Sequence, residues 1–302
     1  MRKKQMRSEA EKMTPHPSLL TPHGTLYIVA TPIGNLEDIT FRAVRVLREV
    51  DLIAAEDTRH SRKLLSHFGI ARPLTSYFDH NKEFKGGYIL NRLKEGLSVA
   101  LISDAGTPCI SDPGYQLVRD AVSGGVQVVP IPGPSAAITA LSVSGLPTES
   151  FAFEGFLPSR QGKRREKLAT LKGERRLLVF YESPNRLPAA LADMTDILGD
   201  REAVVARELT KIYEEFARGT LSHVAAKFRE EKVRGEVVVL VAPAAVPEKM
   251  NASAVSGLLQ NYFSSGKLSL KDAVQRVALE TGMPRGEVYS AALGLKAGLK
   301  EE

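Results

Sequence analysis

The sequence predicts an α/β protein of two domains with mostly parallel sheets, followed by a small helical unit. Three observations support this prediction. From Thr25 onward, short apolar runs alternate with amphipathic helical stretches, which is typical of parallel sheets buried on both faces. Pro132–Pro134 interrupts the alternation, and a Pro/Ala-rich linker near residue 245 ends it. The length of 302 residues fits two domains and an appendage, at roughly 100–200 residues per domain.

The first α/β domain is expected over residues 25–132. Its helical stretches have one apolar face, as Phe41, Val44 and Leu47 illustrate. Strands are expected at Leu26–Ala30, Asp51–Ala55, Val99–Ser103 and Val126–Pro130. Helices are expected at Thr40–Val50, Lys82–Leu93 and Tyr115–Val122.

The second α/β domain is expected over residues 133–245. Pro132 and Gly133 end the preceding strand, and Ser135 is a candidate N-cap for the next helix. Strands are expected at Phe151–Glu154, Leu177–Tyr181, Ala203–Arg207 and Val237–Val241. Helices are expected at Ser135–Val143, Gly162–Leu171, Pro184–Leu198 and Leu221–Glu230.

The two ends of the chain differ from its middle. Residues 1–24 are basic but lack the apolar stretch of a secretory signal, so we expect a disordered tail there. Residues 250–302 are expected to form a small helical domain, in which Leu270–Thr281, a turn at Gly282 and Arg285–Leu293 make a helix-turn-helix pattern. That unit either faces nucleic acid or serves as a helical cap or dimerisation element.

The charge distribution favours a polyanionic partner. The net charge is +6, from 41 basic and 35 acidic residues. The excess is concentrated in residues 1–24, 249–302 and, above all, 159–176, which carry eight basic and two acidic side chains. Each patch alone is explained by solvated helix faces, but the three together favour nucleic acid.

Composition excludes several classes of protein. No apolar run approaches the roughly 18 residues that span a bilayer, so no membrane association is expected. The single cysteine, Cys109, excludes an intramolecular disulfide framework, and the six histidines form no HExxH pair, so no metal is expected. We therefore expect a cytoplasmic protein.

A polar loop, Thr31–Thr40 (TPIGNLEDIT), follows the first predicted strand. Open α/β sheets place ligands at the carboxyl ends of their strands. Pro32 and Gly34 shape a tight loop with exposed amides, although a plain capped turn has the same residues. The loop is not GxGxxG, and no GxxxxGK[ST] occurs, which argues against NAD, FAD and nucleoside triphosphates and demotes an oxidoreductase.

A longer loop, Ser103–Gly114 (SDAGTPCISDPG), follows the third predicted strand. Twelve residues rich in Gly, Pro, Asp and Ser exceed what a turn requires, which favours a functional loop. Gly106 would bring backbone groups against a ligand, and Asp104 would pair with a cation or accept from hydroxyls.

Three further strands are expected to end in polar clusters. Glu56, Asp57 and Arg59 follow one strand, although Asp57 would also serve as a plain helix cap. The other two clusters are Tyr181–Arg186 and Arg207–Lys211 in the second domain. Beside these, His80 and Asn81 follow an aspartate in a loop, where a histidine can act as a general base.

Six motifs in this order resemble the bacterial ribosomal RNA small-subunit methyltransferase I family of the tetrapyrrole methylase superfamily. They are TPIGNLEDIT, AEDTRHSRKLL, LISDAGTPCISDPG, PIPGPSAA, FYESPNRL and ARELTKIYEEFARGTL. The resemblance covers about Thr25 to Pro243, and the final helical unit resembles the family's small C-terminal domain.

The resemblance implies a two-domain tetrapyrrole-methylase-like fold with S-adenosylmethionine (SAM) in the cleft between the domains. It implies 2′-O-methylation of a cytidine in the decoding centre of 16S ribosomal RNA within the small ribosomal subunit, and a homodimer. Carried over by position, cofactor contacts fall on Pro32, Gly34, Ala105, Gly106, Thr107, Ile110, Ser135, Ala136 and Glu182.

The chain departs from the wider superfamily in two loops. The glycine-rich GxGPGD and GGDP sequences of tetrapyrrole enzymes read ATPIGNLED and DAGTP here, so Thr107 replaces an acid. This separates the chain from enzymes that act on porphyrinoids. A small-molecule tetrapyrrole methyltransferase and a non-catalytic RNA-binding assembly factor nevertheless remain the alternatives.

A ribose hydroxyl is a weak nucleophile, so a base, or a cation that stabilises the forming alkoxide, would help methyl transfer. The candidates for that catalytic role are Asp104, Glu56, Asp57 and Lys211, with His80 as a further base. The candidates for contact with RNA are Arg59, His80, Asn81, Lys163, Arg164, Arg165 and Arg186.

Overall fold

The computed structural model describes residues 24–78, 82–111, 114–230, 234–245, 252–264 and 268–298. The chain divides into two compact units, of which the first contains both β-sheets and the second contains the C-terminal helices. Among the described residues, no helix combines the length and apolar character that crossing a bilayer requires. The expected tail at residues 1–24 lies, except for Gly24, outside the described residues.

The first sheet has five strands in the order β3-β2-β4-β1-β5, and every pairing is parallel. Its strands are β1 (Thr25–Val29), β2 (Leu52–Ala55), β3 (Leu74–Ser76), β4 (Val99–Ile102) and β5 (Gln127–Ile131). Its helical elements are the 3₁₀ helix η2 (Leu36–Asp38) and the helices α2 (Phe41–Glu49), α3 (Thr58–His67), α4 (Lys82–Lys94) and α5 (Gly114–Ser123).

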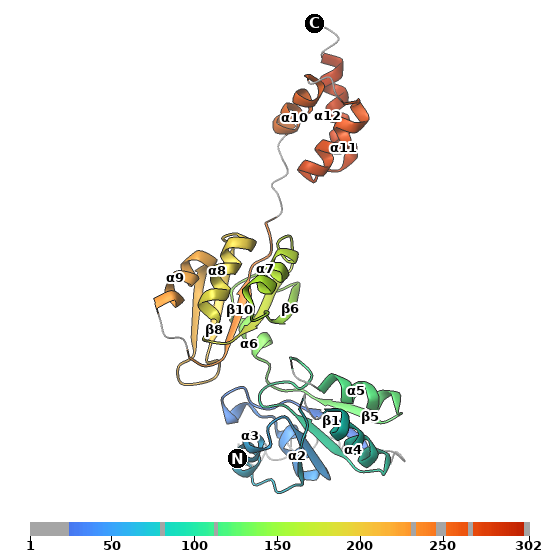
Figure 1. The fold of residues 1–302 in the computed structure, drawn as a ribbon, viewed down its shortest axis with the longest axis vertical. Helices are drawn as coiled ribbons and strands as arrows, with labels where there is room; N and C mark the ends of the chain where they lie inside the picture. The colour runs from blue at the N-terminus through green and yellow to red at the C-terminus, as the bar shows by residue number, and fades with distance from the viewer. Residues whose placement is uncertain are drawn as a thin grey trace, which may run out of the picture. The chain divides into compact units, whose positions relative to one another are not determined.

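Apolar side chains on both faces of this sheet are buried, as the apolar strands predict. Val46 and Leu47 of α2 and Leu65 of α3 pack on one face. Ile89 of α4 and Leu117 of α5 pack on the other. The loops at the carboxyl ends of the strands are left to form a site (Figure 1).

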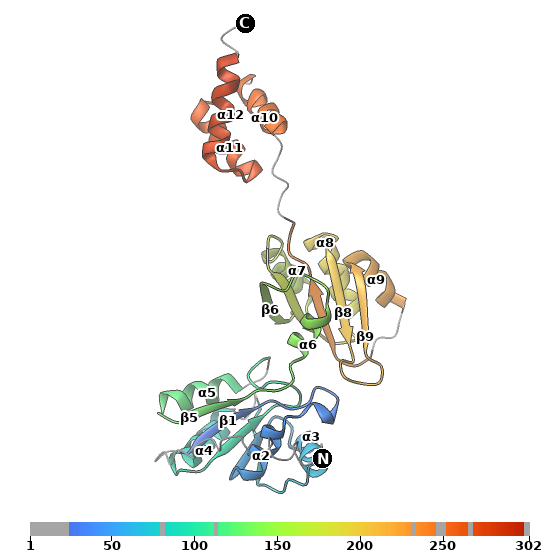
Figure 2. The ribbon, with the colours of Figure 1, turned by 180° about the vertical axis from the view of Figure 1, so that it is seen from behind.

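The second sheet has the order β6-β7-β10-β8-β9. Its strands are β6 (Phe151–Phe156), β7 (Leu177–Glu182), β8 (Glu202–Arg207), β9 (Glu215–Thr220) and β10 (Val237–Val241). Helix α6 (Ala136–Val143) packs on one face, and α7 (Gln161–Thr170), α8 (Leu187–Leu198) and α9 (Leu221–Glu230) cover the other (Figures 1 and 2).

The strand directions of the second sheet differ from the expectation of a mostly parallel sheet. Only β6 and β7 run parallel, whereas β10 is antiparallel to β7 and β8, and β8 is antiparallel to β9. Strand β10 is buried at every position, so it reads as a continuous apolar run, like a parallel strand. Burial alone therefore does not specify direction.

The second unit contains α10 (Ala252–Ser264), α11 (Leu270–Thr281) and α12 (Arg285–Gly298) around a small apolar core. The Ser269 hydroxyl accepts a hydrogen bond from the Asp272 amide and caps α11. Gly282 ends α11 in the left-handed conformation at φ 67°, which a glycine adopts without steric cost. The expected helix–turn–helix pair is present, and α10 is an additional helix.

Candidate functional site

Three loops that follow strands of the first sheet are joined by hydrogen bonds. The Thr31 amide donates a hydrogen bond to the Gly106 carbonyl at 2.9 Å, and the Gly106 amide donates one to the Thr31 carbonyl at 3.0 Å. The Thr107 hydroxyl donates to the Pro134 carbonyl at 3.2 Å and so links the loop before α6. Gly106 has φ 78°, a left-handed conformation that favours glycine, and a Cβ there would already touch Ile33 at 3.4 Å.

These loops, with the ends of strands of the second sheet, enclose a cavity of about 430 Å³. This volume lies within the range of small-molecule sites. The first unit contributes every wall, and the lining residues are Ile33, Glu56, Ser103, Asp104, Ala105, Gly106, Thr107, Ile110, Ser111, Ser135, Ala136, Phe156, Tyr181, Glu182, Ser183, Pro184, Leu209, Gly235, Glu236, Val237 and Val238.

Strained backbone is concentrated at this cavity. Among the described residues, the non-glycine residues with positive φ are Cys109, Ser111, Glu208 and Thr210, at 71°, 71°, 51° and 66°. Two belong to the loop after β4, and two flank the lining residue Leu209. Such conformations cost about 1–3 kcal/mol each and persist where the surrounding structure holds them, typically at functional sites.

The candidate bases divide into two groups. Glu56 and Asp104 line the cavity, and Asp104 accepts a hydrogen bond of 3.0 Å from the Asp57 amide. Asp57 does not line it, because its carboxylate caps α3 by accepting from the Arg59 amide at 2.8 Å and pairs with the Arg59 guanidinium at 3.0 Å. Hydrogen bonds from Arg59 lower the pKa of Asp57 to about 2, so Asp57 is a weak base.

Lys211 lies beside the cavity wall and is held as a cation. Its Nζ is 2.9 Å from Glu208 and 3.4 Å from Glu236, a lining residue. Partial burial lowers the pKa of Lys211, but hydrogen bonds and Coulombic attraction from the two glutamates outweigh burial and raise this pKa overall. The aliphatic part of the Lys211 side chain packs against Gly34. A Cβ at position 34 would lie 2.6 Å from the Cγ and Cε atoms of Lys211.

The predicted cofactor residues gather around the cavity with two exceptions. Pro32 and Gly34 do not line it, although Ile33 between them does. The other seven line it, namely Ala105, Gly106, Thr107, Ile110, Ser135, Ala136 and Glu182. Ser135 is the N-cap of α6 but makes no capping hydrogen bond with its side chain.

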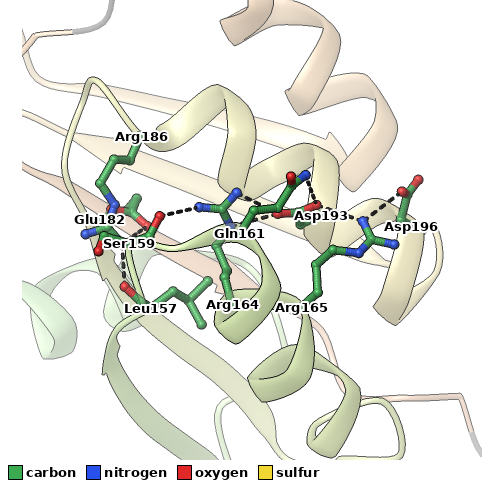
Figure 3. Close-up of polar contacts among 9 residues, drawn as sticks. All are labelled: Leu157, Ser159, Gln161, Arg164, Arg165, Glu182, Arg186, Asp193 and Asp196. Carbon is green, nitrogen blue, oxygen red and sulfur yellow. Dashed lines mark hydrogen bonds and ion pairs between the residues drawn. The ribbon is translucent and has the colours of Figure 1, made fainter.

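The basic residues of α7 are mostly engaged by acidic residues (Figure 3). Arg164 is buried, and its guanidinium pairs with the buried Asp193 of α8 at 2.6 Å. Arg165 bridges Asp193 and Asp196 at 2.8 and 3.1 Å. Arg164 therefore does not present its charge to RNA, which corrects the sequence-based expectation, whereas Lys163 is exposed.

Arg186 also points inward. Its Nη2 atom donates to the Leu157 carbonyl and to Glu182, the latter at 3.1 Å. Arg59 remains largely exposed, with 86% of its side chain accessible. His80 and Asn81 lie outside the described residues.

Comparison with known proteins identifies the family to which the chain belongs. A family model described as Tetrapyrrole (Corrin/Porphyrin) Methylases matches residues 25–225. A protein named Ribosomal RNA small subunit methyltransferase I from Halalkalibacterium halodurans is 50% identical over 88% of this chain and 94% of its own length. Proteins of the same name from Pseudomonas aeruginosa and Escherichia coli O157:H7 are 49% and 46% identical, covering 89% and 93% of this chain and 97% and 99% of their own lengths.

The chain belongs to the ribosomal RNA small subunit methyltransferase I family, within the tetrapyrrole methylases. The resemblance and the α/β tetrapyrrole-methylase fold are thereby confirmed, whereas mostly parallel pairing holds for the first sheet and not for the second.

Solved structures share the fold of this small subunit methyltransferase I family member. A cobalt precorrin-4 methyltransferase matches with TM-score 0.57 at 18% identity, over 76% of this chain and 98% of its own. A uroporphyrin-III C-methyltransferase from Thermus thermophilus, complexed with S-adenyl homocysteine, matches with TM-score 0.50 at 20% identity, over 72% and 97%.

Sequence reasoning missed the part of the wall that the second sheet supplies in this family member. Phe156, Tyr181 and Gly235–Val238 line the cavity but were not candidate cofactor residues. One signal was the glycine before the last apolar strand. Gly235 has φ 82°, and a Cβ there would lie 1.8 Å from Glu208, so another side chain would displace the Glu208 carboxylate.

Proposed function

We propose that this protein transfers the methyl group of SAM to the 2′-hydroxyl of a cytidine in small-subunit ribosomal RNA. The observation that carries the proposal is the acidic cavity in a chain of this family. Four carboxylates line it, from Glu56, Asp104, Glu182 and Glu236, and its described lining contains no lysine or arginine.

This lining fits SAM by charge. SAM carries positive charge on its sulfur and its amino group and negative charge on its carboxylate, so carboxylate walls suit its two cationic groups, whereas they disfavour a triphosphate in the same place. Backbone groups of the Ala105–Thr107 segment and the start of α6 supply partners for its polar groups. SAM, when bound, supplies the methyl group for an in-line displacement.

The residues of the chain then position the acceptor and manage its proton. We assign proton acceptance from the ribose hydroxyl to Asp104 or Glu56, because both line the cavity. Lys211 does not line the cavity, but its ammonium lies 3.4 Å from the lining Glu236, so we assign it electrostatic stabilisation of negative charge that develops on the acceptor oxygen. Tight positioning supplies much of the acceleration in such a step.

RNA phosphates are expected to stay outside the acidic cavity. The exposed Lys163 and Arg59 are the remaining candidates for phosphate contact among the predicted residues. Such contacts position RNA without reading its sequence. We further propose a homodimer that acts in the cytoplasm on the small ribosomal subunit.

Labelled SAM tests this function when three acceptors are compared in parallel. They are small ribosomal subunits that lack the modification, free ribosomal RNA and a porphyrinogen. Label in either RNA acceptor is the expected result. Label in the porphyrinogen alone would instead support a tetrapyrrole methyltransferase. Binding of RNA without any transfer would support a non-catalytic assembly factor.

A further inference from the structure

Helix α3 presents a basic face to solvent, outside the three basic patches of the sequence. Its ten residues carry three cations and no carboxylate. Arg59, Arg62 and Lys63 are all exposed, and their spacing of i, i+3 and i+4 places them on one side of the helix. Ser66, one turn further along, is exposed on the same side, and the buried residues of the helix lie on the other. The outward side of α3 is therefore a stripe of positive charge.

Most of this charge is not neutralised within the protein. Arg59 pairs with Asp57 at 3.0 Å, yet 86% of the Arg59 side chain is accessible. Arg62 and Lys63 form no ion pair with other residues of the described ranges. Because like charges three and four residues apart repel on a helix, the stripe slightly destabilises α3. A solvated face explains the exposure of these side chains, whereas a bound polyanion also explains why only cations are gathered there.

Helix α7, which lies within the most basic segment of the sequence, shows the opposite arrangement. Arg164 and Arg165 pair with acidic residues of α8, and Lys167 pairs with Glu154 at 2.6 Å. These ion pairs offset much of the charge of α7. The exposed charge that is available to a polyanion is therefore more concentrated on α3 than the sequence indicates.

Helix α3 also begins at the candidate functional site. It follows Glu56, which lines the cavity, and the amide of its N-cap residue Asp57 donates to the lining Asp104 at 3.0 Å. Ten residues at 1.5 Å each extend the helix about 15 Å from that point. An acidic cavity repels phosphates, whereas a basic stripe that starts beside it attracts them. This arrangement suits a strand that places one ribose in the cavity and keeps its phosphates outside.

We propose that the exposed face of α3 binds the phosphate backbone of the RNA next to the target nucleotide, through Arg62 and Lys63. The inference rests on the proposed function, which brings RNA to the adjoining cavity. Hydrogen bonds from arginine and lysine to phosphate are charge-assisted and strong. Such contacts fix the position of the strand and carry no sequence information. The stripe thus orients the RNA so that one ribose enters the cavity.

The test uses Arg62→Gln, Lys63→Gln and the double variant in the full-length protein. Binding to small ribosomal subunits is measured across a salt series, and the KM and kcat for methylation are measured with the same subunits. Each single variant is expected to reduce the salt slope of binding by about 1, and the double variant by about 2, with a raised KM. The kcat and the Kd for S-adenosylhomocysteine should not change, because neither residue lines the cavity.

The melting temperature separates this role from a structural one. Glutamine is a good helix former, and its introduction removes repulsion between like charges. The variants at Arg62 and Lys63 should therefore melt no earlier than the wild type. A lowered melting temperature with an unchanged salt slope would show that the stripe only stabilises the fold.

The control is Arg229→Gln in α9, a helix on the second sheet. Arg229 is exposed like Arg62, so its replacement removes the same charge from a different surface. This variant is expected to leave the salt slope and the KM unchanged. An equal reduction of the slope by Arg229→Gln would indicate a general effect of net charge and would contradict the proposal.

A photoreactive amino acid in place of Ser66 identifies what contacts the stripe. When its complex with small ribosomal subunits is irradiated, the protein should become linked to RNA. A link to a ribosomal protein alone, or an unchanged salt slope and KM in both single variants, would overturn the proposal. Failure of the wild type to methylate the subunits would instead reject the proposed function.

Discussion

Single side chains at the cavity have separate tasks that their contacts distinguish. Asp104 and Glu56 face the cavity, whereas the Asp57 carboxylate is occupied by Arg59 and the start of α3. All three follow buried strands in the sequence, which does not rank them, because the ranking depends on which carboxylates line the cavity. Three-dimensional contacts therefore reduce the list of bases.

Replacing the true base removes activity without removing the cofactor. Asp104→Asn or Glu56→Gln is expected to lower kcat about 10²- to 10⁴-fold and to leave the Kd for S-adenosylhomocysteine unchanged. Asp57→Asn, the matched control, is expected to keep most of the wild-type kcat. Equal, small losses in all three variants would contradict the assignment of a carboxylate base.

Asp57 is expected to matter for acid stability instead. Its pKa is about 2 in the folded protein and 3.8 without partners, so its contribution is full above pH 4 and disappears as the pH falls towards 2. The difference in melting temperature between wild type and Asp57→Ala should therefore shrink over that interval. A difference that stays constant from pH 5 to pH 2 would show that the ion pair has no such role.

Lys211 is expected to act as a permanent cation. Glu208 and Glu236 help to raise the pKa of Lys211 above its usual value of 10.5. The methylation rate should therefore not fall below pH 10 through loss of the Lys211 proton. Lys211→Met should lower kcat about 10- to 1000-fold, by analogy with the loss of one oxyanion donor. The Kd for S-adenosylhomocysteine serves as the control for binding, and an unchanged kcat would remove Lys211 from the catalytic step.

At the level of helices and strands, local sequence patterns were informative and long-range pairing was not. The apolar runs predicted β2, β4, β7, β8 and β10, which are largely buried, and also β1, β5 and β6, which are less so. Strands β3, of three residues, and β9, with a polar sequence, had no such pattern. The ion pair between Arg164 of α7 and Asp193 of α8 could not be predicted either, because the two residues are 29 positions apart in the sequence.

The neighbours Lys163 and Arg164 of α7 give a sharp comparison. Arg164→Met leaves Asp193 buried with fewer partners and should cost about 3 kcal/mol of folding stability, with no change in the salt dependence of RNA binding. Lys163→Gln should leave stability unchanged and reduce the salt slope by about 1. Denaturant unfolding and binding across a salt series measure both effects, and the reverse pattern would refute this division.

For the whole molecule, an acidic cavity lies within a chain of net charge +6. This separation of negative charge in the cavity from positive charge elsewhere is expected if the cavity binds a cationic cofactor and the ribose of the target nucleotide. The basic surfaces would then contact the phosphates of the RNA backbone. Family membership follows from six motifs in the sequence. The four carboxylates in the cavity lining and the contribution of the second sheet required the structure, because residues as far apart in the sequence as Glu56 and Glu236 line the same cavity.

The position of the transferred methyl group tests the central claim most directly. Small subunits that lack the modification are methylated with labelled SAM, and their RNA is then hydrolysed in alkali. A 2′-O-methyl group removes the hydroxyl that attacks the adjacent phosphate, so the label should remain in one alkali-resistant linkage at a cytidine. Label on a base, with every linkage cleaved, would contradict the account.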